Sequence, residues 1–218
     1  MKIKICGLTK IEETSYLNEN AVDYAGFVFY EKSRRNVSIE KARELMNGLD
    51  DGIKRVAVTV SPDQALVNRI EEAGFDILQV HGDLDEEVLK SIKIPVWRAL
   101  NIIDVDNACE KLRFYEGEST DLTGKITGIL MDAPDFGSGK PFNWHKSRRL
   151  LKAGDRSSPF YGRDFILAGG LNAGNVAEGI RIFRPDIVDV SSGVEGENGK
   201  SEEKITEFVK AVRTAEGL

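Results

Sequence analysis

Hydrophobic positions alternate between two spacings along the whole chain. Short runs rich in Ile, Val and Phe are followed by stretches in which apolar residues recur at helical spacing. Most of the short runs are almost continuously apolar, as expected for parallel strands that are covered on both faces. The predicted strands are residues 2–6, 23–29, 54–60, 76–80, 94–100, 126–132, 164–168 and 186–190. The pattern indicates repeated βα units around a parallel sheet.

The segments between these runs have the spacing of helices with one inward face. In the clearest one, Ser61 is expected to cap the helix, Pro62 to occupy its first position and Gln64 to complete a capping box. The same spacing recurs in Ala42, Leu45, Met46 and Leu49, in Val105, Ala108, Cys109 and Leu112, and in Ile205, Phe208, Val209 and Val212. Cys109 is therefore assigned to the core.

About eight βα units favour a closed (β/α)8 barrel. A doubly wound sheet usually has five or six strands and often opens with a glycine-rich dinucleotide loop, but no G-x-G-x-x-G motif follows an early strand here. The chain has 218 residues, fewer than the roughly 250 typical of such barrels. The polar stretches 116–125 and 152–163 are expected to be surface loops. We predict a single α/β domain over residues 1–218, a (β/α)8 TIM barrel.

Composition and charge exclude several classes of function. The net charge of −6 is spread along the sequence without a long basic stripe, which argues against nucleic-acid and membrane-surface binding. No apolar stretch approaches the roughly 20 residues that span a bilayer, and the N-terminus lacks the apolar centre of a signal peptide. Two cysteines are too few for a disulfide framework or a zinc cluster. We expect a soluble, cytoplasmic protein with a small-molecule ligand.

The active site of such a barrel lies at the carboxyl ends of its strands. Reactive, charged or glycine-rich positions concentrate there: Cys6, Lys32, Ser33, Arg34, Arg35, His81, Arg98, Asp132, Gly169, Gly170, Ser191, Ser192 and Gly193. The strongest signal is a pair of turns, Gly169-Gly170 before a helix expected near Asn172, and Ser191-Ser192-Gly193. Their backbone amides can hold a phosphate dianion. The turn Gly137-Ser138-Gly139-Lys140 can add amides to the same site.

Cys6 and Asp132 end strands that can face each other across the barrel mouth. A thiol with an ordinary pKa of about 8.5 needs an electropositive surrounding to act as a base. Asp132 can donate a proton at neutral pH only if its pKa rises by about 3 units. Taken singly, Cys6 also fits a packed thiol and Asp132 a loop cap. Arg34 or Arg35 can clamp a ligand carboxylate, and His81 is expected to form a wall of the pocket.

Several segments, taken in order, resemble one family of enzymes. They are Lys4–Thr9, Gly26–Phe29, Lys32–Arg35, Gln79–Gly82, Met131–Ala133, Gly137–Lys140, Phe142–Trp144, Leu167–Asn172 and Val188–Glu195. Each segment alone is a weak signal, but the ordered set covers nearly the whole chain. It resembles the phosphoribosylanthranilate isomerases of tryptophan biosynthesis.

The resemblance implies an Amadori rearrangement of N-(5-phosphoribosyl)anthranilate on a (β/α)8 barrel, without cofactor or metal. It implies Cys6 as the general base, Asp132 as the general acid and Arg35 as the residue that holds the anthranilate carboxylate. Arg34 stands where the family usually has a proline, which leaves open which arginine binds. The other implied substrate-binding residues are His81, Gly137, Gly139, Gly169, Gly170, Asp189, Ser191, Ser192 and Gly193. The protein is expected to be a monomer or a homodimer.

Three other functions stay open at this point. Another sugar-phosphate isomerase or epimerase can share the phosphate turns. A metal-dependent epimerase would need several His and Asp ligands at the strand ends, and His81 is the only histidine of the sequence that stands there. A barrel that binds a phosphorylated metabolite without chemistry is opposed by the presence of both Cys6 and Asp132. A histidine-pathway aminoimidazole ribotide, which undergoes the same rearrangement, is a candidate second substrate.

Overall fold

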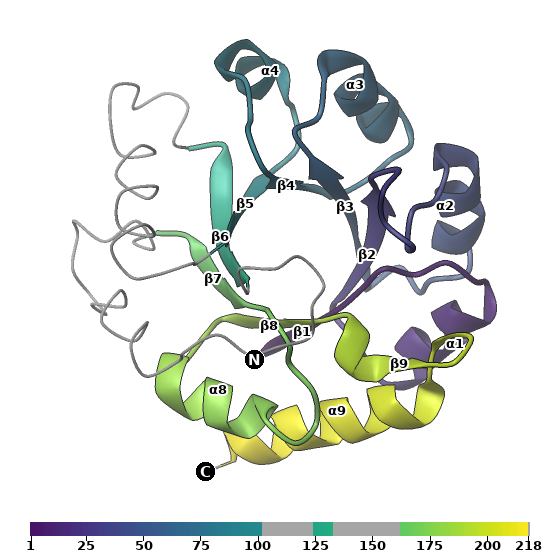
Figure 1. Cartoon of the computed structure of the whole chain (residues 1–218), viewed down its shortest axis with the longest axis vertical. Coiled ribbons are helices and arrows are strands. Elements are labelled where there is room, and N and C mark those ends of the chain that lie inside the picture. The colour runs from purple at the N-terminus through teal and green to yellow at the C-terminus, as the bar shows by residue number, and fades with distance from the viewer. Residues whose placement is uncertain (102–123, 133–161, 218) are drawn as a thin grey trace.

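A closed ring of parallel strands forms the centre of the molecule (Figure 1). The computed structural model describes residues 1–101, 124–132 and 162–217. Eight strands pair in chain order, and β1 pairs with β8 to close the barrel. The strands are β1 (Lys2–Cys6), β2 (Tyr24–Phe29), β3 (Lys54–Val60), β4 (Ile77–His81), β5 (Val96–Asn101), β6 (Ile126–Asp132), β7 (Asp164–Leu167) and β8 (Ile187–Val190). The predicted barrel is confirmed, and the predicted strands differ from these only at their ends.

The described helices lie outside this ring (Figure 1). They are α1 (Glu12–Glu19), α2 (Ile39–Met46), α3 (Gln64–Glu72), α4 (Glu86–Ser91), α8 (Val176–Phe183) and α9 (Glu202–Glu216). A 3-10 helix η2 (Ser192–Val194) and an antiparallel pair, β9 (Glu195–Gly196) with β10 (Gly199–Lys200), connect β8 to α9. None of the helices in the described ranges is long and apolar enough to cross a membrane. The predicted stripe around Cys109 lies outside the described residues, as do the two predicted loops except at their last residues.

Alternation of side chains along the strands separates two hydrophobic layers. Ile3 and Ile5 of β1 belong to the layer between strands and helices, whereas Cys6 belongs to the barrel interior. The interior layer consists of Cys6, Tyr24, Val56, Val58, Ile77, Trp97, Ala99, Leu130, Ile166, Ala168 and Ile187. Because alternate residues share a face, Lys4 and Cys6 point to the same interior.

The predicted inward faces of α2 and α9 are confirmed. On α2 and just after it, the side chains of Ala42, Leu45, Met46 and Leu49 are buried. On α9, Ile205, Phe208 and Val212 are buried and Val209 packs partly buried against them. Amphipathic spacing alone thus identified the contact faces of these helices.

The predicted cap of α3 is wrong by two residues. Ser61 has a positive φ of 45°, and its hydroxyl accepts a hydrogen bond from the amide of Asp83 (2.9 Å). Asp63 caps the helix instead, accepting from the amide of Leu66 (2.8 Å). Serine and aspartate are both good caps, and the tertiary contact to Asp83 decides between them.

Candidate active site

A cavity of about 460 Å³ opens at the carboxyl ends of the barrel strands. It is lined by Cys6, Val28, Tyr30, Lys32, Ser33, Arg34, Arg35, Val58, Val60, Gln79, His81, Asp132, Ala168, Gly169, Gly170, Leu171, Asp189, Ser191 and Ser192. Both predicted catalytic residues, Cys6 and Asp132, therefore face one space. Of the other predicted ligand residues, Gly193 is not in the lining, and Gly137 and Gly139 lie outside the described residues.

The register between β1 and β2 makes room for the Cys6 thiol. Cys6 lies opposite Gly26. A Cβ at position 26 would lie 2.9 Å from Cys6 Sγ and 3.2 Å from Lys4 Nζ. The absence of a side chain on β2 thus lets the thiol and the ammonium lie side by side. The hydroxyl of Ser191 donates to the backbone carbonyl of Cys6 (2.9 Å), which ties the end of β1 to the end of β8.

Lys4 and Asp189 form a buried ion pair below the thiol. They lie opposite each other in the β1–β8 register, and Lys4 Nζ is 2.9 Å from Asp189 Oδ2. The Lys4 side chain is 0% exposed and that of Asp189 8%. Burial acts to lower the pKa of Lys4, but the charges of Asp189 and Cys6 outweigh it and raise the pKa above its ordinary value. We use the term floor for Cys6 and Asp189, which line the cavity, together with Lys4, which pairs with Asp189 but does not line the cavity.

One oxygen of the floor carboxylate has no hydrogen-bond partner among the described residues. Asp189 Oδ1 is buried, and no donor among the described residues lies within hydrogen-bond distance of it. Asp189 also lines the cavity. Buried polar atoms are normally hydrogen-bonded, so this oxygen is suited to accept from a ligand hydroxyl.

Burial dominates the acidity of Cys6. It raises the pKa of the thiol, the charges of Lys4 and Lys200 lower it, and the charge of Asp189 raises it again. The net direction is upward, so the thiol is mostly protonated at neutral pH. The electropositive surrounding expected for a basic thiol is present, but it offsets only part of the cost of burying a thiolate.

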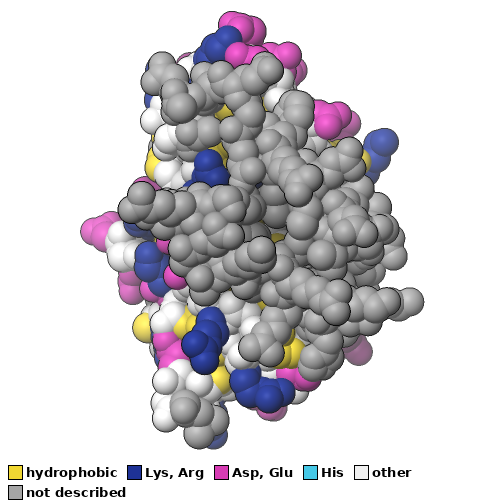
Figure 2. Space-filling model, turned by 90° about the vertical axis from the view of Figure 1, so that its left-hand side faces the viewer, with side chains coloured by type: hydrophobic (Ala, Val, Ile, Leu, Met, Phe, Trp, Pro, Cys, Tyr) yellow, Lys and Arg dark blue, Asp and Glu magenta, His cyan; other side chains and the backbone are white. Residues whose placement is uncertain are grey.

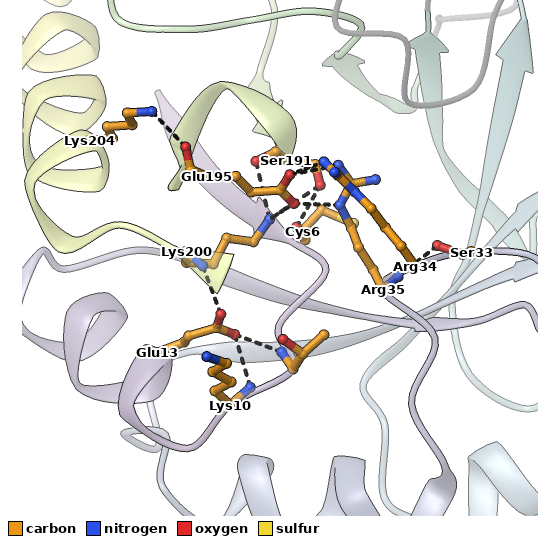
Figure 3. A network of polar contacts seen from close by, with 11 residues as sticks. Cys6, Lys10, Glu13, Ser33, Arg34, Arg35, Ser191, Glu195, Lys200 and Lys204 are labelled. Carbon is orange, nitrogen blue, oxygen red and sulfur yellow. Dashed lines mark hydrogen bonds and ion pairs between the residues drawn. The ribbon is translucent and has the colours of Figure 1, made fainter. Parts of the chain in front are cut away.

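Glu195 gathers three cations at the edge of the cavity (Figure 3). Arg35 binds it with two hydrogen bonds, Nε to Oε1 (2.5 Å) and Nη2 to Oε2 (3.0 Å), and Arg34 also donates to Oε2. Lys200 Nζ lies 3.0 Å from Oε1. Partial burial would raise the pKa of Glu195, but the Arg35 hydrogen bond and the Lys200 charge hold it at about 2. We call Arg34, Arg35, Glu195 and Lys200 the rim.

A second acidic residue holds the rim lysine in place (Figure 3). Glu13 on α1 accepts from the backbone amide of Lys200 through Oε1 (2.8 Å). Its other oxygen accepts from the amides of Thr9 (2.6 Å) and Lys10 (3.1 Å). The loop after β1 and the β9–β10 pair are thereby joined, which directs the Lys200 ammonium toward Glu195 and the backbone oxygen of Ser191 (3.1 Å).

The turn after β7 exposes backbone amides to the cavity. Gly169 and Gly170 have positive φ angles of 85° and 70°, which favour glycine. Their amides donate to no other atom of the described residues. Asn175 donates to the carbonyl of Gly170 (2.9 Å) and accepts from the amide of Asn172 (2.8 Å). This asparagine turn delays the start of α8 to Val176, so the helix expected near Asn172 begins later than predicted.

The turn after β8 packs tightly against the turn after β7. Ser191 and Ser192 line the cavity. A Cβ on Gly193 would lie 1.9 Å from the carbonyl oxygen of Leu171, so no side chain fits there without backbone movement. Gly193 thus lets the two turns pack together. The prediction that Gly193 contacts a ligand stays a prediction, and it concerns the backbone of Gly193 only.

His81 is held neutral. Burial lowers its pKa to about 3, with further lowering by the charges of Lys4 and Arg98. The amide nitrogen of Gln79 lies 2.9 Å from His81 Nε2. Arg98 was expected at the end of a strand, but it lies within β5. Its guanidinium donates to the carbonyl of Gly82 (2.6 Å), and Arg98 is not among the residues that line the cavity. A neutral ring fits the expected wall of the pocket rather than an acid or a base.

Three charged residues of the site were not singled out from the sequence. Lys4 had a usable signal, because it stands two positions before Cys6 and must share its face of the strand. Glu195 and Lys200 had none, because their contact depends on how β9 and β10 fold back toward β1.

Charge is mixed on the part of the molecular face that Figure 2 shows in colour. In the view of Figure 2, Lys and Arg side chains are interspersed with Asp and Glu. Within residues 1–101, 124–132 and 162–217, no group of three or more His, Cys, Asp or Glu could hold a metal ion. The cavity, with cations in both its floor and its rim, is therefore the described place best suited to an anionic organic ligand.

A model of one protein family matches almost the entire chain. The family is described as N-(5'phosphoribosyl)anthranilate (PRA) isomerase, and the match covers residues 3–211. The chain belongs to this isomerase family. An N-(5'-phosphoribosyl)anthranilate isomerase of Streptococcus gordonii is 40% identical over 97% of both chains. That of Aquifex aeolicus is 34% identical, covering 98% of this chain and 99% of the relative.

Solved structures of the isomerase family have the same fold. The phosphoribosyl anthranilate isomerase of Thermotoga maritima is 32% identical, with a TM-score of 0.82 and full coverage of both chains. A second structure, an isomerase in complex with reduced 1-(o-carboxyphenylamino)-1-deoxyribulose 5-phosphate, is 30% identical with a TM-score of 0.77 and the same coverage. The resemblance of the ordered sequence segments to this family is thereby confirmed.

Proposed function

We propose that this chain converts N-(5-phosphoribosyl)anthranilate into 1-(2-carboxyphenylamino)-1-deoxyribulose 5-phosphate in tryptophan biosynthesis. The observation that carries the proposal is a single cavity lined by a thiol, a carboxyl group and two glycine-rich or serine-rich turns. Membership of the isomerase family supports the same reaction. The reaction moves two hydrogens within one molecule, so an acid and a base on one substrate are the minimum machinery.

Asp132 is the proposed general acid. It ends β6 and lines the cavity, so its proton can reach the ring oxygen of the ribose. Protonation there breaks the bond between C1 and the ring oxygen, and the nitrogen lone pair forms an iminium. Asp132 must be protonated when substrate binds in order to act as the acid.

Cys6 is the proposed general base. Its thiolate removes the proton from C2 of the iminium, and the electron pair of the C–H bond forms an enolamine. Tautomerisation of the enolamine then gives the ketone. A thiol with a raised pKa is mostly protonated when free, but its thiolate is a correspondingly stronger base.

The remaining lining residues hold the two ends of the substrate. Gly169 and Gly170 offer the phosphate backbone amides that have no acceptor among the described residues, with Ser191 and Ser192 on the neighbouring turn. Arg35 offers a planar fork to the anthranilate carboxylate. Holding both ends brings C1 and C2 between the acid and the base, and such orientation is a large part of catalysis.

The test is the decay of substrate fluorescence after adding purified protein to freshly formed phosphoribosylanthranilate. We expect decay far faster than in buffer for the natural chain, and decay at least about 100-fold slower for Cys6→Ser. Binding of the reduced product analogue should be kept in that variant. Tight analogue binding without any acceleration by the natural chain would show a binding barrel and reject the isomerase.

A further inference from the structure

A lysine without exposed surface lies inside the barrel, next to the thiol. Moving an ammonium group from water into a protein interior costs several kcal/mol unless it is paired. Lys4 is 0% exposed and is paired by Asp189 at 2.9 Å. An apolar pair of similar size would fill this space at lower cost, so packing alone does not account for the charge.

The position of the ammonium points to the thiol as its second partner. Lys4 and Cys6 are alternate residues of β1 and face the same interior. Lys4 Nζ and Cys6 Sγ both lie over the Cα of Gly26, and each would be about 3 Å from a Cβ there, at 3.2 Å and 2.9 Å. The ammonium is therefore close both to the carboxylate of Asp189 and to the thiol.

We infer that Lys4 is a positioning residue for Cys6: its ammonium stabilises the Cys6 thiolate, and the hydrogen bond to Asp189 holds that ammonium in place. The inference rests on the proposed function of Cys6 as the base. Lys4 does not line the cavity, so it acts through the thiolate and not on substrate. When the thiolate takes the proton from the substrate it becomes a neutral thiol beside the Lys4–Asp189 pair.

Four charged groups, on β1, β8, β10 and the loop after β2, interact electrostatically with the thiolate. Lys4 on β1 and Lys200 on β10 favour the thiolate, and Asp189 on β8 opposes it. Arg35, after β2, also interacts with the thiolate charge. Lys200 and Arg35 are both bound to Glu195, which offsets their charge at the rim. Lys4 lowers the pKa of Cys6 more than Lys200 does. Removal of Lys4 should therefore raise the pKa of the thiol most strongly.

The test measures ionisation of Cys6 without substrate. A Cys109→Ala background leaves Cys6 as the only thiol, since the chain has two cysteines. The rate of iodoacetamide alkylation is followed against pH by intact mass. Lys4→Met should slow alkylation at neutral pH about tenfold or more, because an opposite charge at this range shifts a pKa by about 1 to 3 units. Lys4→Arg should restore most of the rate, and Asp189→Asn should increase it.

Matched variants separate charge from structure. Lys2→Met removes a lysine from the exposed end of the same strand and should leave the alkylation profile unchanged. If Lys4→Met does not fold, Asp189→Asn is compared with the double variant Lys4→Met/Asp189→Asn, which differs from it only at Lys4. Equal alkylation profiles in that comparison, or in Lys4→Met and the parent, overturn the inference.

Turnover gives an independent readout. In Lys4→Met the rise of kcat with pH should move to higher pH, so that activity recovers in alkali, which a purely structural defect would not produce. If the natural chain does not isomerise phosphoribosylanthranilate while the alkylation profiles still shift, the proposed function fails and the charge assignment stands. If the natural chain is active and the profiles coincide, only the role of Lys4 fails.

Discussion

The floor and the rim of the cavity hold their charges differently. In the floor, one cation meets one anion inside the barrel, with side chains 0% and 8% exposed. In the rim, three cations share the carboxylate of Glu195, and Arg34 among them is 72% exposed. The exposed Arg34 contact contributes little, but Arg35 and Lys200 are only 14% and 1% exposed, so Glu195 is held mainly by largely buried cations. The floor thus has one cation for one anion beside Cys6, whereas the rim has three cations for one carboxylate and is suited to receive a second carboxylate, that of a ligand.

The largest expected effect lies at the reacting groups. Cys6→Ser in the floor and Asp132→Asn across the cavity should each lower kcat by at least about 100-fold, because each removes one proton transfer. KM should change little, since neither group is needed to hold the phosphate or the carboxylate. Steady-state fluorescence assays measure both constants. Asp164→Asn is the matched control, because Asp164 begins β7 at the end of the barrel away from the cavity. A comparable loss of kcat in that variant would contradict the assignment of Cys6 and Asp132 as base and acid.

A rim substitution should act on KM instead. Arg35→Lys keeps the charge but removes the two-pronged contact, so we expect KM to rise by about 10- to 100-fold, the equivalent of about 1.4 to 2.7 kcal/mol, with kcat nearly unchanged. Arg34→Lys should raise KM less than about threefold, because its side chain is mostly exposed. The reverse order would assign the carboxylate to Arg34.

Crowding at the floor should appear as lost stability. Gly26→Ala places a Cβ 2.9 Å from Cys6 Sγ and 3.1 Å from Cys6 Cα. We expect the free energy of unfolding to fall by about 1 to 3 kcal/mol, measured by urea denaturation. Gly52→Ala is the control, because no atom lies within 4 Å of a Cβ there. Equal stabilities of the two variants would show that the floor can rearrange to accept the methyl group.

The smallest effect should be a difference in pH dependence between floor and rim. The pKa of Glu195 is lowered from 4.5 to about 2, so its contribution to stability is complete above about pH 4.5 and is lost as pH falls toward 2. The natural chain should exceed Glu195→Gln by about 1 kcal/mol at neutral pH, and the difference should vanish in acid. Thermal unfolding at several pH values measures it, and a constant difference would argue against the ionised carboxylate.

The contribution of the floor to stability should depend on pH in the opposite direction to that of the rim. The pKa of Lys4 is raised above 10.5, so its contribution is complete below that pH and is lost only as pH rises beyond it. A loss of the floor contribution in mild acid would therefore contradict the buried Lys4–Asp189 pair.

Much of the fold and the site could be predicted because both repeat simple rules. Continuous apolar runs marked the strands, and the carboxyl ends of those strands then indicated Cys6, His81 and Asp132. The helix caps were less predictable. Serine and aspartate can both cap, and the distant contact between Ser61 and Asp83 left Asp63 as the cap of α3. The local hydrogen bonds of Asn175 delayed the start of α8.

The amino-acid sequence by itself determined the barrel, the end at which the site lies and the residue types available there. These follow from local periodicity and from the direction of parallel strands. Only the tertiary structure decided which charges meet. Lys4 finds Asp189 because β1 closes on β8, and Arg35 finds Glu195 because the chain folds back after β8. Such contacts join residues from opposite ends of the chain, and no local pattern encodes their distance.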